Sequence, residues 1–207
     1  MTPDFLCLHL ERSAGLPLDM VVTNPHPVTH SVLCKQAHRF RRFIVDDMKL
    51  SSIWGDAFPE AASNLEELRI DAHPNYPSLG FLVPIFDGSL PKLRSLQLHN
   101  VPFCSAGMFK GLRHLEFING VQTLPLFIPL ILDTLQVSPL LETLSIENCC
   151  ILPDSQYACN VAPLPHLRRL HATSDAVSKL LHLIDISSSA NIEIAHPPPP
   201  AKFWDLV

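Results

Sequence analysis

The stretch Leu93-Arg94-Ser95-Leu96-Gln97-Leu98-His99-Asn100 decides how the rest of this chain folds. Its leucines stand at positions one, four and six and an asparagine closes it, which is the spacing of a leucine-rich repeat. Successive side chains of a β-strand alternate between two sides, so Leu96 and Leu98 are predicted to face a core while their neighbours face away. The side-chain amide of Asn100 is suited to bond backbone groups where the chain turns out of the strand.

The same spacing recurs along the chain. The six triplets are Phe40-x-x-Phe43-x-Val45, Leu65-x-x-Leu68-x-Ile70, Leu93-x-x-Leu96-x-Leu98, Leu112-x-x-Leu115-x-Phe117, Leu141-x-x-Leu144-x-Ile146 and Leu167-x-x-Leu170-x-Ala172. They start at residues 40, 65, 93, 112, 141 and 167, so successive starts are 25, 28, 19, 29 and 26 residues apart. These steps bracket the repeat length of leucine-rich repeats, although irregularly.

Further elements are expected around these triplets. A short helix in residues 5–12, a turn at Ser13 to Gly15 and a first strand at about 18–22 precede a helix over 28–38. Helical inserts are expected at 76–87, 124–136 and 174–183, a loop at 101–111 and a last strand at about 191–194. Residues 196–207 begin with His196 and four consecutive prolines and are expected to form a disordered tail. Neither the region before Leu18 nor this tail is expected to cap the stack well.

Together these patterns predict an α/β fold, an irregular leucine-rich repeat solenoid over residues 1–195. Each strand-plus-helix unit has one apolar face that it cannot bury alone, so the units stack with parallel strands on a concave side and helices and loops on the convex side. The residues that alternate with the repeat leucines are then offered to a partner. They are Arg42, Ile44, Glu67, Arg69, Ser95, Gln97, His114, Glu116, Thr143, Ser145, Arg169 and His171.

The composition narrows the classes of partner and compartment. The 207 residues are 47% hydrophobic and carry a formal net charge of -5, which gives no general attraction to phosphate backbones. The longest apolar stretch, 124–132, is too short to span a membrane, and the first residues lack the features of a signal peptide. Six sparse cysteines are expected to be reduced thiols. We therefore expect an intracellular protein, cytoplasmic or nuclear, that binds neither nucleic acid nor membranes.

Catalytic and metal-binding alternatives find little support in the sequence. Cys149, Cys150 and Cys159 with His166 and His171 have poor spacing for zinc, so structural packing is preferred. Nucleophile pairs such as Cys104 with His114, or Cys159 with His171, lack a visible third partner. No phosphate-binding glycine loop, Gly-x-Ser-x-Gly or His-Glu-x-x-His motif occurs. The expectation is a protein without enzymatic activity, cofactor or metal.

The run Arg39-Phe40-Arg41-Arg42 alternates basic and aromatic groups, as in some nucleic-acid-binding surfaces. Phe40 opens a repeat triplet, however, and Asp46 and Asp47 follow closely. The preferred interpretation is a solvated strand edge.

Several segments of the sequence resemble the repeat region of fungal, mushroom-type F-box proteins. The early part shows Leu10-Glu11-Arg12-Ser13 before the Pro17-Leu18-Asp19-Met20 strand, and then His38-Arg39-Phe40-Arg41-Arg42-Phe43. Leu90-Pro91-Lys92-Leu93-Arg94-Ser95-Leu96 and Leu164-Pro165-His166-Leu167-Arg168-Arg169-Leu170 resemble the Leu-Pro-x-Leu-x-x-Leu repeats of that family, and Ser138-Pro139-Leu140-Leu141-Glu142-Thr143-Leu144 resembles its Ser-Pro variant. The resemblance covers residues 5 to about 195.

In that family an amino-terminal F-box docks the adaptor of a cullin ubiquitin ligase, and the repeats recruit the protein to be ubiquitylated. The four given residues before Phe5 are too few to form an F-box. The resemblance therefore implies a substrate-recognition region whose adaptor would bind only if an F-box were supplied upstream. Three alternatives compete with this role: a stand-alone repeat protein unrelated to ubiquitin, an enzyme whose site lies in the loops, and a truncated gene product without a function of its own. The partner itself is expected to be a protein.

Overall fold

The structure is a computed structural model, and it describes most of the chain outside several connecting segments and the last residues. The described residues are 3–13, 15–23, 27–48, 61–72, 86, 90–101, 109–119, 125–152, 161–173 and 178–195. The predicted insert at 76–87 lies outside them except for Phe86, and so do most of the predicted loop at 101–111 and the whole of the tail at 196–207.

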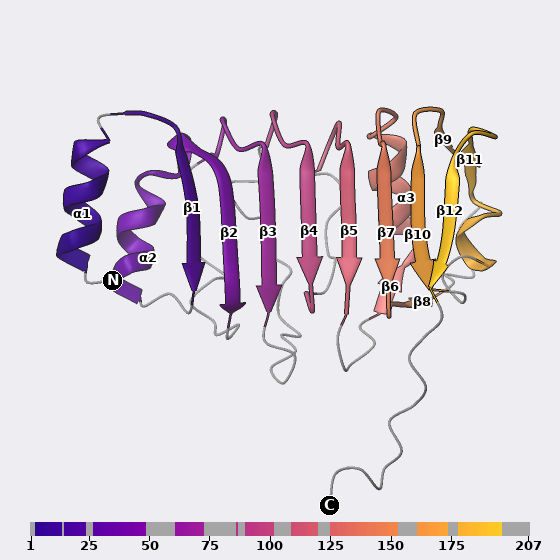
Figure 1. Ribbon diagram of the computed structural model, residues 1–207, viewed down its shortest axis with the longest axis horizontal. Coiled ribbons are helices and arrows are strands. Elements are labelled where there is room, and N and C mark those ends of the chain that lie inside the picture. Colours follow the sequence, from indigo (N-terminus) through magenta and orange to yellow (C-terminus); the bar gives the residue numbers. More distant parts are fainter. Residues whose placement is uncertain are drawn as a thin grey trace, which may run out of the picture.

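Eight strands lie side by side in one open sheet, in the order β1-β2-β3-β4-β5-β7-β10-β12, and each neighbouring pair is parallel (Figure 1). Their bounds are β1 Leu18–Thr23, β2 Phe40–Met48, β3 Glu67–Ala72, β4 Ser95–His99, β5 His114–Ile118, β7 Thr143–Glu147, β10 Arg169–Thr173 and β12 Asn191–Ala195. Their spatial order is their chain order, and the strands missing from it, β6, β8, β9 and β11, are short and pair outside this sheet. The chain is therefore α/β with a parallel sheet, as expected, and the sheet is not closed.

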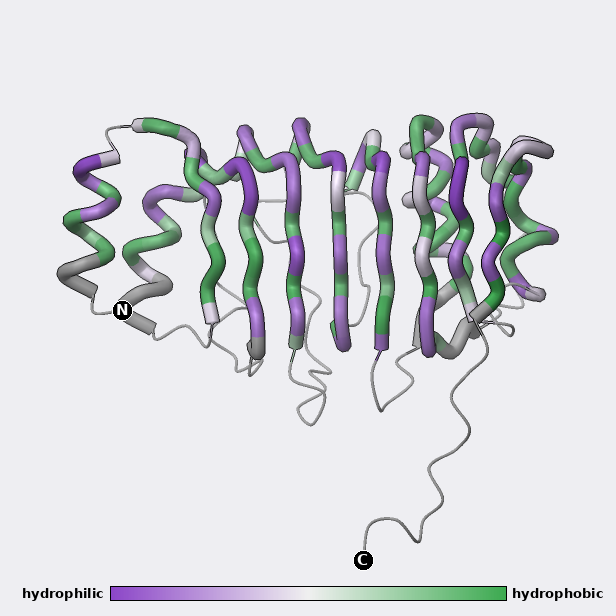
Figure 2. Tube along the Cα trace, viewed as in Figure 1, coloured by the Kyte–Doolittle hydropathy of each residue, from purple (hydrophilic) through white to green (hydrophobic). Residues whose placement is uncertain are grey.

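The register aligns the leucines of all the triplets. The fourth-position residues Leu68, Leu96, Leu115, Leu144 and Leu170 are direct neighbours across β3, β4, β5, β7 and β10, and each is at most 1% exposed. The residues two positions later form a second buried row, and the first-position leucines are buried as well. Figure 2 shows the resulting alternation of hydrophobic and hydrophilic residues along the strands. The predicted inside and outside of these strands are confirmed.

Helices lie at one end of the sheet and behind it. The helices are α1 Pro3–Arg12, α2 Pro27–Cys34 and α3 Ile128–Gln136, with a short 3-10 helix, η1, at Ala37–Arg39. Helices α1 and α2 stand beside β1, and α3 lies behind the sheet near β7 and β10 (Figure 1). The buried face of α3 includes Ile131, Leu132 and Leu135, which is the amphipathic spacing predicted for this insert.

Three predicted helix boundaries are wrong. The helix expected over 28–38 ends at Cys34, and η1 follows after a turn. The insert expected to be helical from 124 begins instead with a strand, β6, at Pro125–Phe127, before α3 starts with a proline at its second residue, where a missing N–H costs nothing. Of the insert at 174–183, the described part has only one helical turn at 178–180 before a strand begins at Ile184.

A second layer of short strands was not predicted. Strand β6 pairs with β8, Cys150–Leu152, and β9, Ala162–Leu164, pairs with β11, Ile184–Ile186. Each spans three residues, too short for any alternation to show in the sequence. Both pairs are parallel, so the layer behind the main sheet contains strand ladders as well as helices.

The region before β1 caps its end of the sheet, which corrects the expectation that it does little there. Leu6 and Leu10 of α1 and Leu33 of α2 are 3%, 8% and 1% exposed and belong to the main hydrophobic core. Arg39 joins this cap to β2, since its guanidinium donates hydrogen bonds to the carbonyls of Leu10 and Leu16, to the Ser13 hydroxyl and to the Gln36 side chain. Arg39 is 8% exposed, so the solvated strand edge expected for it is wrong.

The asparagine that closes the repeat has the structural role predicted from the sequence. Asn100 adopts a φ of 56°, and its side-chain amide donates to the carbonyl of Ala72 at 3.0 Å. Asn148 holds the same backbone conformation with a φ of 53°, and it likewise comes two residues after the last apolar position of its triplet. Asparagine tolerates the left-handed region better than other side chains, which favours it at these strand exits.

Candidate functional site

The side of the sheet opposite the core carries two parallel rows of side chains, mostly polar, and we call this side the open face. Its first row runs Asp19, Arg42, Glu67, Ser95, His114, Thr143, Arg169 and Asn191. Its second row runs Val21, Ile44, Arg69, Gln97, Glu116, Ser145, His171 and Glu193. All twelve residues expected on the concave side lie in these two rows, each beside its counterpart on the next strand.

Most of these twelve side chains are half-buried or exposed, but two expose little surface. Ser145 is 7% exposed and Ile44 is 9% exposed. Ile44 lies between Val21 and Arg69 in the second row and is not part of the main core. These two residues contribute little contact area to a partner. The capacity of the others to bind one stays a prediction.

Ion pairs fix the charged side chains at the β1–β3 end of the open face. The guanidinium of Arg42 lies 3.0 Å from the Glu67 carboxylate, and Arg41 pairs with Asp19 through both of its oxygens. The hydrogen bonds from Arg41 hold the pKa of Asp19 below its usual value. All four side chains remain partly exposed, so the ion pairs orient these side chains but add little to the stability of the fold.

His99 bridges two carboxylates in the middle of the open face. Its Nε2 lies 2.8 Å from Glu116 on β5, and its Nδ1 lies 3.3 Å from Asp71 on β3. The hydrogen bond with Glu116 raises the pKa of His99, against the opposing effect of burial, and it lowers the pKa of Glu116. A protonated ring donates from both nitrogens, so this arrangement favours the imidazolium form.

A second bridge of the same kind lies nearer the other end of the sheet. The ring of His171 on β10 has Nε2 3.3 Å from Glu147 on β7 and Nδ1 3.3 Å from Glu193 on β12. His99 and His171 therefore cross-link three strands each, while the ring of His114 is exposed.

A further row of charged residues, which was not predicted from the sequence, lies at the strand starts. It consists of Arg41, Glu66, Arg94, Arg113, Glu142 and Arg168, and we call it the strand-start row. From Glu66 onward each backbone N–H in this row donates to the carbonyl of the previous member, so the ladder continues beyond the strands. The signal was present in the sequence, since the residue after the first apolar position is charged in all six triplets.

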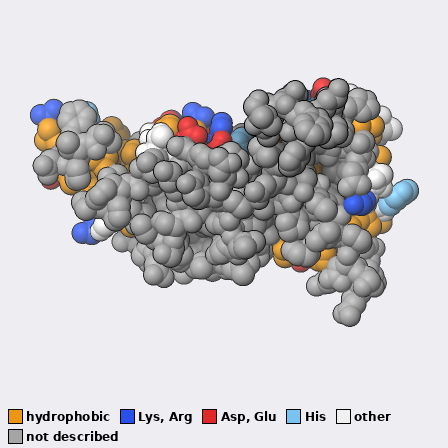
Figure 3. All heavy atoms as spheres, turned by 90° about the horizontal axis from the view of Figure 1, so that it is seen from below, with side chains coloured by type: hydrophobic (Ala, Val, Ile, Leu, Met, Phe, Trp, Pro, Cys, Tyr) orange, Lys and Arg blue, Asp and Glu red, His pale blue; other side chains and the backbone are white. Residues whose placement is uncertain are grey.

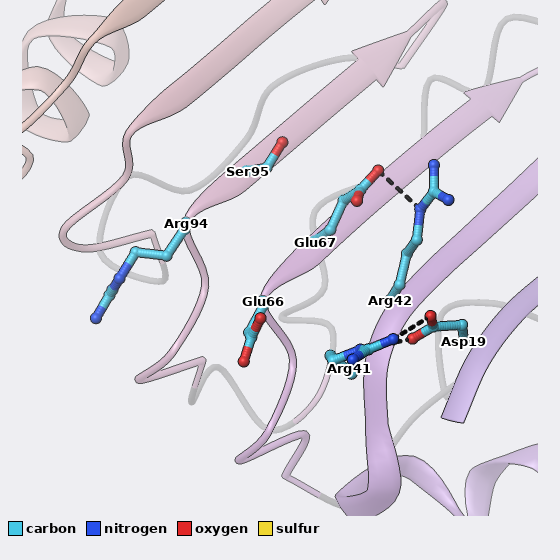
Figure 4. A pocket seen from close by; sticks show the side chains of 7 residues that line it. All are labelled: Asp19, Arg41, Arg42, Glu66, Glu67, Arg94 and Ser95. Carbon is cyan, nitrogen blue, oxygen red and sulfur yellow. Dashed lines mark hydrogen bonds and ion pairs between the residues drawn. The ribbon is translucent and has the colours of Figure 1, made fainter. Parts of the chain in front are cut away.

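A shallow pocket of about 380 Å³ opens where the strand-start row meets the first row, over β1 to β4. Its lining is Asp19, Arg41, Arg42, Glu66, Glu67, Arg94 and Ser95. Figure 4 shows the two ion pairs on one wall of this pocket, with Glu66 and Arg94 apart from them. The guanidinium of Arg94 instead donates to the carbonyls of Leu93 and Gly111. The lining carries three positive and three negative side chains, so the pocket suits a partner group that offers both charges.

Acidic and basic side chains lie next to one another along the upper margin of Figure 3. Along the strands, however, the charge of the side chains changes from one end to the other. The strand-start row has four arginines against two glutamates, whereas the positions at the far end of the strands include Asp71 and Glu147. Electrostatic complementarity to such a gradient would orient a bound protein.

Among the cysteines of the alternative sites, the structure describes the side chain of Cys149. Cys149 is 5% exposed and lies against the amide of Asn119 at 3.2 Å, which is a packing role. Cys104 and Cys159 lie outside the described residues, as does the side chain of Cys150. Within the described ranges, no group of three or more His, Cys, Asp or Glu side chains could hold a metal ion.

No helix in the described part of the chain is long and apolar enough to cross a membrane. In comparisons with known proteins, no protein-family model, curated protein or solved structure matches the chain.

Proposed function

We propose that this chain is a leucine-rich repeat solenoid whose open face binds another protein. The observation that carries the proposal is the open face itself, which presents polar side chains from eight parallel strands in continuous rows. Below those rows the repeat leucines pack into one core. An extended parallel sheet of this kind offers a broad, regular surface, the form in which stacked repeats recognise proteins.

A protein partner fits the open face better than a polyanion or a small molecule. The charged side chains alternate in sign and are tied to one another, as with Arg42 and Glu67 or His99 and Glu116. A nucleic acid would require an excess of free cations, which the net charge of -5 does not favour. The pocket over β1 to β4 is open and lined by charged groups, unlike the mostly apolar cavities that enclose small ligands.

The resemblance to fungal F-box proteins supports a more specific role, that of recognising the substrate of a cullin ubiquitin ligase. In this role the open face selects the protein to be ubiquitylated, and an F-box supplied in addition to these repeats would dock the adaptor. The chain performs no chemistry of its own. Its contribution to the reaction is to hold a bound protein beside the ligase.

Site-specific photo-crosslinking tests the binding role. A photoreactive amino acid at Gln97, in the middle of the open face, is expected to capture a defined protein from cells, and one at the exposed His182 behind the sheet is not. Capture should be lost in an Arg69→Glu variant that retains the wild-type melting temperature. Equal capture from both positions, or capture that survives Arg69→Glu, would contradict binding at this face.

The ubiquitin role requires a second measurement. The captured protein is expected to be ubiquitylated in a reconstituted cullin reaction when an F-box is joined to the repeats, and not when Arg69→Glu is present. Binding without ubiquitylation would support protein binding at the open face but contradict a role in a ubiquitin ligase.

A further inference from the structure

The two ends of the sheet differ in what packs against the last strand. At one end α1 and α2 stand beside β1, and Leu18 and Met20 of that strand pack against the core (Figure 1). At the other end β12 is the last strand in the described sheet. Its core-side residues Ile192 and Ile194 are 40% and 49% exposed, and they do not belong to the core.

The register shows that these isoleucines occupy core positions. Ile192 is the neighbour of Leu170 and Ile194 is the neighbour of Ala172, and both of those residues are at most 1% exposed. Between the isoleucines, Glu193 lies on the open face with 71% of its side chain exposed, and His171 contacts it from the β10 side. The outer edge of β12 therefore presents an apolar, an acidic and an apolar position in succession.

We propose that the outer edge of β12, the last strand of the described sheet, binds an extended segment of another protein, which adds to the sheet as a ninth strand. Half of the backbone N–H and C=O groups of a parallel edge strand point outward and can pair with such a segment. The complementary segment has the pattern apolar–basic–apolar, with its apolar side chains against Ile192 and Ile194 and its Lys or Arg beside Glu193. This pattern reads the same in both directions, so either strand orientation satisfies it.

Two other occupants fit the edge less well. A second copy of the chain, paired antiparallel about Glu193, would place two carboxylates opposite each other. The chain's own continuation begins with four prolines at 197–200, which lack the N–H groups that a ladder needs. Ala201-Lys202-Phe203 beyond them does have the apolar–basic–apolar pattern, so the test must include it.

Fluorescence anisotropy with two labelled peptides tests the proposal on the full chain. One peptide has the sequence Ser-Thr-Val-Lys-Val-Thr-Ser with blocked ends, and the other has Glu in place of Lys. Wild-type protein is expected to bind the lysine peptide at least tenfold more tightly, and Glu193→Lys is expected to reverse the preference. Glu11→Lys, a matched charge change on α1 at the opposite end, should leave the preference as in the wild type, and Ile192→Ser should weaken the binding of both peptides.

Equal affinity for the two peptides, or binding of neither, would overturn the proposal. If Lys202→Glu raised the affinity for the lysine peptide tenfold, the chain's own continuation would be the occupant instead. Concentration-dependent dimerisation in sedimentation, abolished by Ile194→Asp, would assign the edge to a second copy. Of the open face only Glu193, in the last strand, takes part in these measurements. Capture at Gln97 is measured separately, so failure of one proposal can be told from failure of the other.

Discussion

His99 joins three strands of the open face. Its side of the sheet could be predicted from the sequence, but its burial and its partners could not. The alternation of the sequence places His99 outside the core, and the structure agrees, but the side chain is only 14% exposed. Its partners Asp71 and Glu116 lie 28 and 17 residues away along the chain. Such contacts depend on the register between strands, which the triplets imply, and on side-chain directions, which they do not.

This bridge makes the stability of the sheet depend on pH. The pKa of His99 is raised, so its contribution is present below the ordinary histidine value of 6.5 and is lost as the pH rises through the folded value. The pKa of Glu116 is lowered, so its contribution is present above 4.5 and is lost as the pH falls through the folded value. The pair therefore stabilises the fold most between those two values.

Urea denaturation of the wild type and of Glu116→Gln from pH 4 to pH 9 measures this dependence. The difference between their free energies of unfolding is expected to peak between pH 4.5 and 6.5 and to shrink toward pH 9. The variant Glu142→Gln, whose carboxylate pairs with Arg113 rather than with a histidine, serves as the control. A difference that stays constant over the whole range would show that the His99–Glu116 pair does not form.

At the scale of elements, strands with a clear period were predictable and short elements were not. The triplets fixed β2 to β5, β7 and β10, because each combines buried apolar residues with a two-residue alternation. Strands β6, β8, β9 and β11 span three residues each and show no such period. The strand-start row was not predicted for another reason. Alternation places only side chains inside a strand, and every member of the row except Arg41 precedes its strand.

The junction between α1 and β2 depends on Arg39, whose neighbour Arg41 is exposed and provides a matched comparison. The guanidinium of Arg39 donates hydrogen bonds to the last turn of α1 and to the loop after it. A cation is also favourable there, because the C-terminal end of a helix dipole is negative. Arg39→Met is expected to lower the free energy of unfolding by about 2–4 kcal/mol, because the carbonyls of Leu10 and Leu16 lose a charged donor in a buried or partly buried setting. Arg41→Gln, which breaks only the exposed pair with Asp19, should leave stability nearly unchanged.

Chemical denaturation of both variants, followed by circular dichroism, checks this prediction. Equal losses from the two substitutions would mean that Arg39 does not anchor the cap. A stable Arg39→Met variant would likewise show that α1 packs without it.

At the scale of the whole molecule, the sequence predicted the parallel stack but not how its ends are finished. Apolar residues spaced along α1 indicated a helix, yet nothing in the sequence alone placed it against β1, since that contact joins segments without a shared pattern. At the other end, Asn191-Ile192-Glu193-Ile194 was correctly expected to be a strand. Its exposed isoleucines emerged only from the structure, because exposure depends on what lies next to the strand rather than on the strand itself.

Alternate residues of the strands face opposite sides of one sheet, and the core, the open face and the proposed binding all depend on this. The most direct test is the free energy of unfolding, from urea denaturation, of two pairs of alanine variants. Leu96→Ala and Leu144→Ala, both at fully buried positions, are each expected to lose about 2–5 kcal/mol through the cavities they leave. Ser95→Ala and Gln97→Ala, on the open face beside Leu96, should each stay within about 0.5 kcal/mol of the wild type. The reverse order of losses would contradict the assignment of core and open face.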